Sequence, residues 1–265
     1  MSLWFFGYVA LGALAGFFAG LLGVGGGGIM VPILAMMFAA QGFPAGHLMH
    51  VALGTSMATI VFTSISSMRA HDRHGAVIWS IVRAIAPGIV VGTVLGAQVA
   101  GRMPTRPLAI FFAAFITYVA LQMILNVKPK PSRELPGAAG MFGVGGFIGL
   151  VSALVAIGGG SLSVPFMTWC NVKVHLAIGT SAAIGFPIAL AGTAGYMIAG
   201  YDATGLPDGS LGFIYLPALA GTVIASVLAA PFGAQVAHSL PVATIRKVFA
   251  VVLILLSAKM LHGLF

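Results

Sequence analysis

Gly23-Val-Gly-Gly-Gly-Gly-Ile-Met-Val-Pro32 interrupts a long apolar run, and a near copy, Ala156-Ile-Gly-Gly-Gly-Ser-Leu-Ser-Val-Pro165, interrupts another run later in the chain. Consecutive glycines weaken a helix and leave backbone N–H groups without partners. A membrane protein tolerates such backbone only where it is buried in protein or lines a cavity. Paired breaks at corresponding places in two halves are the best sequence indication of a transporter's binding site.

The composition is that of a protein embedded in a membrane. Hydrophobic residues make up 60% of the chain and charged residues 6%, with a mean hydropathy of +1.10, whereas a soluble domain has about 25% charged residues. The net charge of +8 does not indicate nucleic-acid binding, because no basic stripe lies on a soluble face. A single cysteine, Cys170, excludes an internal disulfide and a cysteine-based metal site. No basic region precedes the first apolar run, which predicts a membrane segment rather than a cleaved signal.

Eight apolar runs are long enough to span a bilayer, which requires about 20 residues. They cover 3–23, 47–68, 76–99, 106–126, 137–157, 174–200, 213–237 and 242–263. Two shorter apolar pieces, 29–40 and 161–171, directly follow the glycine motifs. We predict that they are half-helices or re-entrant hairpins, and the sequence leaves open whether they cross the membrane or turn back.

The chain divides into two transmembrane repeats, 1–127 and 137–265, joined by a polar, proline-rich linker at 128–136. His50-Val-Ala-Leu-Gly-Thr-Ser-Met-Ala58 matches His175-Leu-Ala-Ile-Gly-Thr-Ser-Ala-Ala183, and Gly-Ala-Gln-Val-Ala occurs at both 96–100 and 233–237. The loop 69–74 is basic, but its counterpart at 201–209 contains two aspartates and no Lys or Arg, which favours opposite membrane sides. We therefore predict an all-α integral membrane protein of about eight transmembrane helices in two homologous, inverted repeats, with glycine-broken or re-entrant helices.

Backbone amides and hydroxyl groups are the candidate substrate ligands. A helix N-terminus presents unpaired N–H groups and the positive end of the helix dipole, an arrangement that binds anions. The alternative is helix packing for the glycines, and hydrogen bonds to backbone or to other helices for the hydroxyls. The predicted substrate-binding residues are Gly25, Gly26, Gly27, Gly28, Thr55, Ser56, Gly158, Gly159, Gly160, Ser161, Thr180 and Ser181.

Five further polar residues are secondary candidates. His50 and His175 could carry a coupled proton, although each lies near the start of an apolar run, where a solvated histidine is ordinary. Arg83 lies within a predicted span, which marks a functional candidate, or it extends to the interface. Gln98 and Gln235 either face a polar cavity or join helices by hydrogen bonds.

Enzyme motifs are missing from the sequence. It contains no HExxH zinc site, no Walker loop and no cluster of Cys and His ligands, so we predict no metal site, no cofactor and no catalytic residue. All four acids lie in predicted loops. The absence of a carboxylate within a span favours an anionic substrate over a cation.

These motifs resemble those of the TauE/SafE family of sulfite and organosulfonate exporters. The resemblance rests on the glycine-rich breaks followed by Val-Pro, the paired Gly-Thr-Ser blocks and the two halves around a short polar centre. It implies a multi-pass carrier of the bacterial inner membrane for small sulfur-containing anions. Ser161 stands where the first motif has its fourth glycine, so the two half-sites are unequal.

We therefore predict a secondary transporter, exporting a sulfur-containing anion such as sulfite or an organosulfonate by alternating access. The two breaks and the two Gly-Thr-Ser blocks would meet near mid-membrane, and one half would rock against the other. The alternatives are an anion channel and a carrier of a different small anion, such as a carboxylate. The expected partners are the anion, the lipid bilayer and a coupled proton, with no nucleic acid. The sequence does not give the oligomeric state.

Overall fold

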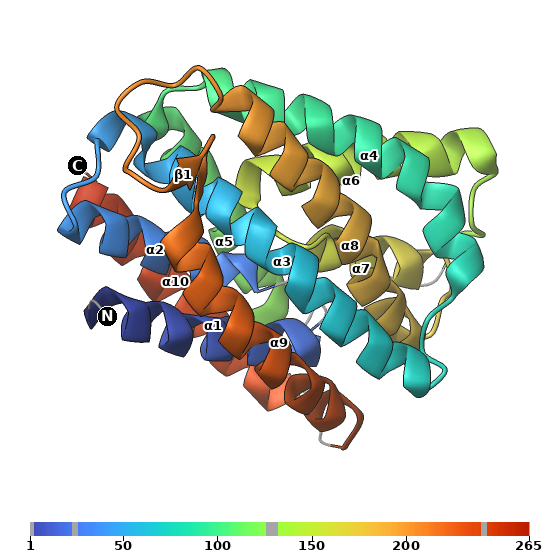
Figure 1. The fold of residues 1–265 in the computed structure, drawn as a ribbon. Coiled ribbons are helices and arrows are strands. Elements are labelled where there is room, and N and C mark those ends of the chain that lie inside the picture. The colour runs from blue at the N-terminus through green and yellow to red at the C-terminus, as the bar shows by residue number, and fades with distance from the viewer. Residues whose placement is uncertain (1–2, 23–25, 126–131, 240–242, 265) are drawn as a thin grey trace.

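The computed structural model describes residues 3–22, 26–125, 132–239 and 243–264, which are mostly helical (Figure 1). Two antiparallel strands of two residues each, β1 (Ser210–Leu211) and β2 (Ile214–Tyr215), precede the helix that begins at Leu216. The helices are α1 (Leu3–Leu22), α2 (Gly27–Ala40), the 3-10 turn η1 (Ala45–His47), α3 (Leu48–Arg73), α4 (Trp79–Arg102), α5 (Thr105–Ile124), α6 (Ala138–Val155), α7 (Gly160–Trp169), α8 (Val174–Ala199), α9 (Leu216–Ser239) and α10 (Ala243–Leu264).

The predicted spans correspond to helices. Seven helices are long and apolar enough to cross a membrane within the described residues: α1, α3, α4, α5, α6, α8 and α9. The eighth run, 242–263, forms α10, and the side chains at its start lie outside the described residues. The short pieces after the glycine motifs form separate helices, α2 and α7. The predicted all-α fold of an integral membrane protein is confirmed.

One bundle consists of α1, α3 and α9, which run parallel to one another. A side chain added at Gly12 of α1 would overlap the backbone of Thr222 in α9, and one turn later Gly16 lies equally close to Ser226. The hydroxyl of Thr59 in α3 lies 2.8 Å from that of Thr222. The next turn of α3 repeats this contact at Ser226. Glycines at one-turn intervals allow the two backbones to approach this closely.

A second bundle consists of α4, α6 and α8. Gly88 of α4 packs on the carbonyl oxygen of Phe142 in α6, and one turn later Gly92 packs on that of Gly146, so these two helices are parallel. The third helix, α8, packs along α4 through Gly195. The two bundles are thus built in the same way, with a glycine face at the centre of each.

The bundles pack on each other through α3 and α8, which are antiparallel. Ser64 of α3 lies beside Gly185 of α8, whereas Met57, earlier in α3, contacts Gly192, later in α8. Each helix therefore runs opposite to its counterpart in the other repeat: α1 to α6, α3 to α8 and α4 to α9. The repeats are inverted, as predicted from the loop charges.

Each bundle takes helices from both repeats, so the repeats are interwoven. The first contains α1 and α3 with α9, and the second contains α4 with α6 and α8. Outside the bundles, α2 packs on α3 and α10, α7 packs on α8, and α5 packs on α10. The bounds 1–127 and 137–265 stay a prediction, since the linker 128–136 lies partly outside the described residues.

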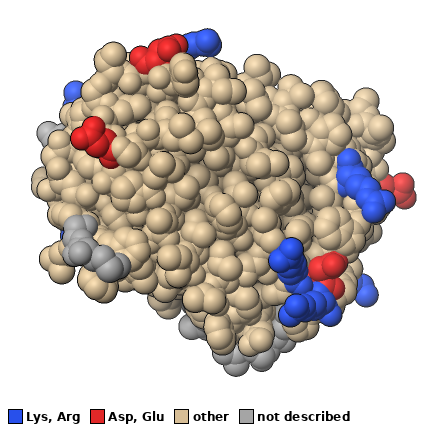
Figure 2. All heavy atoms as spheres, in the orientation of Figure 1, with Lys and Arg blue, Asp and Glu red and all other residues tan. Residues whose placement is uncertain are grey.

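Basic side chains gather at the end of the molecule where α3 ends and α8 begins. Figure 2 shows a concentration of Lys and Arg on the right, the side toward which α3 runs in Figure 1. Because basic loops stay in the cytoplasm, we expect this basic end to face inward. Among the residues with described side chains, the basic end has Arg69, Arg73, Arg83, Arg133, Lys173 and Lys247, and the opposite end has Arg102, Arg106 and Lys259.

Candidate functional site

Two glycines with left-handed backbones begin the two short helices. Gly26 (φ 75°) precedes α2 and Gly159 (φ 80°) precedes α7, and no side chain caps either helix. A residue with a Cβ is strained at such φ values, so glycine is the residue that fits. The N–H groups of Ile29 and Met30 both donate to the carbonyl of Gly26. Each break therefore opens a helix N-terminus, with its partial positive charge, inside the protein.

The two breaks touch each other. A methyl group added to Gly27, the first residue of α2, would overlap the carbonyl oxygen of Ala156, the residue that ends α6. The next residue, Gly28, fits between Leu253 of α10 and Ile116 of α5. Gly25 lies outside the described residues. The structure thus brings the glycine motifs of both repeats together, as the sequence predicts.

The breaks lie beside the crossing of α3 and α8. The side chain of Ile60 in α3 would be 3.3 Å from a methyl group at Gly27. On the other side, a methyl group at Gly185 of α8 would lie 3.2 Å from the carbonyl oxygen of Gly158. Both breaks are therefore next to the two most enclosed helices, at the centre of the molecule.

Several buried hydroxyls near the second break have no hydrogen-bond partner among the described residues. Ser161 and Ser163 stand in the first turn of α7, 7% and 0% exposed, and neither Oγ is bonded. Gly160, between Gly159 and Ser161, is the first residue of that helix. A buried hydroxyl left unpaired costs about 1–3 kcal/mol, so unpaired hydroxyls concentrated beside a helix N-terminus are typical of a site for a polar ligand.

A small cavity lies against the second break. It has a volume of about 10 Å³, which is room for about one water molecule. Ser67 of α3, whose Oγ is unpaired, lines it together with Thr63, Ser64 and Gly158. The cavity is polar on the α3 side, yet it is too small for an oxyanion in this conformation.

The two Gly-Thr-Ser blocks do not join the glycine breaks. The Oγ1 of Thr55 accepts a hydrogen bond from the N–H of Tyr215, and that of Thr180 accepts one from Ile78, both at 3.0 Å. These two N–H groups immediately precede α9 and α4. Ser181 donates to a carbonyl of its own helix, and the Oγ of Ser56 is buried without a partner.

The blocks also lie at opposite ends of the molecule. Gly54 packs against Tyr196, which is sixteen residues beyond Thr180 on α8, roughly 24 Å at 1.5 Å per residue. The expectation that both blocks meet near mid-membrane is therefore wrong, because α3 and α8 are antiparallel and cross near their middles. A substrate-binding role for their hydroxyls stays a prediction.

The two histidines occupy different surroundings. The Nε2 of His50 lies 3.1 Å from the carbonyl oxygen of Ala100 and 3.0 Å from that of Met103, so it carries a hydrogen and donates to the end of α4. The ring of His50 lies 4.9 Å from the ring of Phe213. His175 is exposed at the start of α8. Neither lies at the breaks, and a role in proton coupling stays a prediction.

The remaining candidates lie away from the breaks as well. Gln98 is half-buried, and its Nε2 donates to the carbonyl of Gly195 at 3.2 Å, which joins α4 to α8. Gln235 is exposed on α9. Arg83 is exposed on the outer face of α4, one turn after its start, where its guanidinium can extend to the membrane surface.

A row of hydroxyls between α3 and α9 was not predicted. Thr63 donates to Ser226 at 2.8 Å, one turn beyond the contact of Thr59 with Thr222, and Ser66 donates to the carbonyl of Val227 at 2.8 Å. The spacing Thr55, Thr59, Thr63 along one helical face could have indicated it. On α8, the positions equivalent to Thr59, Thr63 and Ser66 hold residues without hydroxyls, namely Ile184, Ile188 and Ala191. The row of hydroxyls therefore belongs to the contact of α3 with α9, and α8 does not repeat it.

Comparisons with known proteins agree with the resemblance inferred from the sequence motifs. The family model described as "Sulfite exporter TauE/SafE" matches residues 8–260. A probable membrane transporter protein of Haemophilus influenzae is 37% identical over 252 residues, which are 94% of this chain and 95% of the relative. YunE of Bacillus subtilis, also named a probable membrane transporter protein, is 26% identical over 97% of each chain.

A third relative covers somewhat less of the chain. The probable membrane transporter protein MJ0441 of Methanocaldococcus jannaschii is 26% identical over 84% of this chain and 80% of its own length. No solved structure matches the chain. Since the family model leaves only a few residues at each end unmatched, the resemblance inferred from the motifs is confirmed, and the chain belongs to the TauE/SafE sulfite exporter family of membrane transporters.

Proposed function

We propose that this protein is a secondary transporter, without enzymatic activity, that exports a small sulfur-containing oxyanion such as sulfite or an organosulfonate across the bacterial plasma membrane. The family to which it belongs and the transporter names of its relatives support transport in general. The choice of an anion rests on the site. The oriented amides and hydroxyls there suit a negative charge, and no acid lies in the described part of any long helix away from its ends.

The contact between the two helix breaks carries the proposal. Gly26 and Gly159 each open a helix N-terminus toward the interior, and Gly27 of one break touches Ala156 of the other. N–H groups at a helix N-terminus replace the water around an anion without a buried countercharge. The unpaired hydroxyls of Ser161 and Ser163 supply further donors to the same oxyanion.

The binding site must expand before it accepts an oxyanion. The cavity at the second break holds about 10 Å³, so the bundle of α1, α3 and α9 must move relative to the bundle of α4, α6 and α8. These bundles meet along α3 and α8, where the small residues Gly185 and Gly192 lie beside Ser64 and Met57. Because the repeats are interwoven, they do not move as two separate halves. Alternating access operates instead between the two mixed bundles, each of which contains helices of both repeats.

Binding and flux together test this proposal. Melting of the detergent-purified protein is measured with sulfite, sulfate, thiosulfate, sulfoacetate, taurine, lactate and chloride, since a ligand of the folded form raises its melting temperature. The expected result is a selective rise with a sulfur oxyanion or sulfonate. Lactate as the selective ligand would point to a carboxylate carrier, and no rise with any anion well above millimolar would overturn the anion site.

Counterflow in sealed proteoliposomes separates a carrier from a channel. Vesicles loaded with unlabelled sulfite should accumulate labelled sulfite from outside, because a carrier exchanges substrate across the membrane. Flux should also saturate with concentration. Flux that neither saturates nor shows counterflow would indicate an anion channel in which the same amides form the filter.

A further inference from the structure

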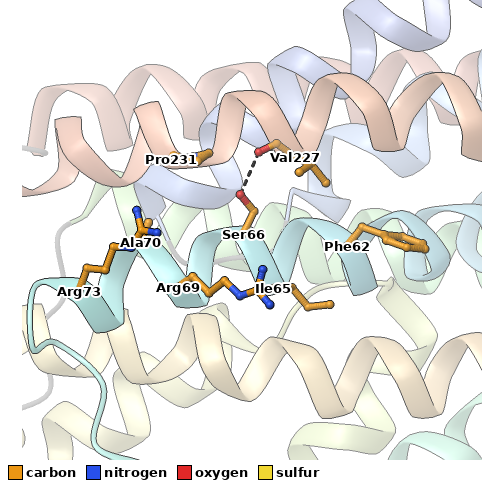
Figure 3. Close-up of a pocket in the computed structure, with 8 residues that line it drawn as sticks. All are labelled: Phe62, Ile65, Ser66, Arg69, Ala70, Arg73, Val227 and Pro231. Carbon is orange, nitrogen blue, oxygen red and sulfur yellow. Dashed lines mark hydrogen bonds between the residues drawn. The ribbon is translucent and has the colours of Figure 1, made fainter.

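We propose that a groove between α3 and α9 at the basic end binds the phosphate headgroup of an anionic phospholipid. The groove has a volume of about 300 Å³ and opens to the outside of the helix bundle (Figure 3). It is independent of the site at the helix breaks. The residues that carry the argument are Phe62, Ile65, Arg69 and Arg73 of α3, and Val227 and Pro231 of α9.

The groove changes from apolar to basic along its length. Figure 3 shows Phe62 at one end of the α3 face and Arg73 at the other, with Arg69 between them. From Phe62 to Arg73 the helix rises by about 16 Å. The apolar part lies toward the middle of α3 and the arginines lie in its last turns. This order matches a phospholipid, whose acyl chains lie deeper in the membrane than its phosphate.

The residues that line the groove include two arginines and no acid. Neither Arg69 nor Arg73 has an acidic partner among the described residues. The nearest acid in sequence, Asp72, accepts a hydrogen bond from the indole N–H of Trp79 at 2.9 Å, on the α4 side. Two unpaired guanidinium groups at the membrane surface favour a phosphate, which arginine binds through two parallel hydrogen bonds.

The groove is separate from the interior hydroxyls. Ser66 donates to the carbonyl of Val227, and this bond joins α3 to α9 along the inner wall of the groove (Figure 3). On the outer side, Phe62 is 45% exposed, toward the position of lipid.

The inverted repeat does not duplicate the groove. The positions of α8 equivalent to Arg69 and Arg73 are Ala194 and Ile198. The arginines are therefore not required by the repeated fold, and they lie at the end where we expect the cytoplasmic leaflet. Basic pockets between membrane helices on this side are suited to anionic headgroups.

Native mass spectrometry of the delipidated, detergent-purified protein tests the proposal with dioleoyl-phosphatidylglycerol as the probe and dioleoyl-phosphatidylcholine as the neutral comparison. The double variant Arg69→Gln/Arg73→Gln should bind phosphatidylglycerol about thirtyfold more weakly, at about 1 kcal/mol for each arginine. The matched control Lys173→Gln/Lys247→Gln removes two exposed charges from the same end and should bind like the wild type. Equal weakening in both double variants would mean general charge attraction and would overturn the proposal.

Two further measurements test whether the lipid binds in the groove and whether a soluble anion binds there instead. Ile65→Trp fills the groove without changing its charge and should also weaken phosphatidylglycerol binding, whereas unchanged binding would contradict the groove. Inorganic phosphate and sulfite, added at matched concentrations, should not displace the lipid. Any rise in melting temperature that they cause should be equal in the wild type and in the double variant that lacks Arg69 and Arg73. A rise that the arginine double variant loses would assign the site to a soluble anion instead of a lipid.

Discussion

Gly27 lies against the carbonyl oxygen of Ala156, so the break that begins α2 touches the break that ends α6. This contact joins residues of the two inverted repeats at the centre of the molecule. It also fixes what position 27 can hold, since any Cβ there meets a backbone atom that cannot turn away. Glycine at this position is required by the approach of two backbones.

Gly27→Ala should therefore separate the two breaks. We expect the free energy of unfolding to fall by about 1–3 kcal/mol, the usual cost of an overpacked interior, and flux to fall with it. The measurement is melting of the purified protein together with transport in vesicles. Gly143→Ala is the control, because a methyl group there meets nothing within 4 Å and should leave both unchanged or raise stability slightly. Normal melting of Gly27→Ala would contradict the contact.

Ser161→Ala and Ser163→Ala should change stability and transport in opposite directions. Each removes a buried hydroxyl that has no described partner, so the melting temperature should stay the same or rise. If these hydroxyls donate to the anion, the concentration of substrate for half-maximal flux should increase severalfold. Thr193→Ala, which removes a hydroxyl bonded to its own helix and is no candidate ligand, is the comparison. Unchanged flux in both Ser161→Ala and Ser163→Ala would remove them from the site.

Thr55→Val and Thr180→Val should each destabilise the protein. Each leaves one N–H group, of Tyr215 or Ile78, without its acceptor, at a cost of about 1–3 kcal/mol. Thr→Ser at either position keeps the acceptor and should melt close to the wild type. If the valine variants melt normally but lose substrate binding, the hydroxyls serve the substrate, as the sequence predicts.

Cross-links should reveal which helices move during transport. With Cys170 replaced by Ala, cysteines at Met57 and Gly192 join the two bundles across α3 and α8, and cross-linking them should abolish flux. Cysteines at Gly101 of α4 and Ala199 of α8 join helices within one bundle and should leave flux intact after cross-linking. Equal inhibition by both pairs would argue against movement between the mixed bundles.

The distribution of basic residues predicts the orientation in the membrane. If the end with Arg69 and Arg73 faces the cytoplasm, the C-terminus of α10 faces outward, because α10 ends at the opposite side. Alkaline phosphatase fused after Phe265 should therefore be active, and phosphatase fused after Ser132 should be inactive. The reverse pattern would overturn the orientation and place the α3–α9 groove in the outer leaflet.

The sequence predicts the helices and the breaks well because both depend on local properties. Apolar runs of spanning length became α1, α3 and the other long helices, and consecutive glycines marked the start of α2 and α7. The inversion was also predictable, since loop charge reports the membrane side. These features need no knowledge of which helix packs on which.

The positions of the Gly-Thr-Ser blocks were not predictable in the same way. Identical motifs suggested a shared site, but antiparallel α3 and α8 carry Thr55 and Thr180 to opposite ends. The partner of Thr55 is the N–H of Tyr215, 160 residues later. A sequence repeat shows that two residues have equivalent surroundings, and equivalent surroundings in an inverted pair need not be close together.

The mixed bundles also bear on how such a chain is made. The glycine face of α1 is covered by α9, which begins only at Leu216, so the helix synthesised first waits for its partner until most of the protein has been inserted. One repeat alone leaves the faces of both α1 and α4 uncovered. A protein half this length would close those faces by pairing with a second copy inserted in the opposite orientation. The linker turns that antiparallel dimer into one polypeptide, and it fixes the ratio and the orientation of the two parts at synthesis.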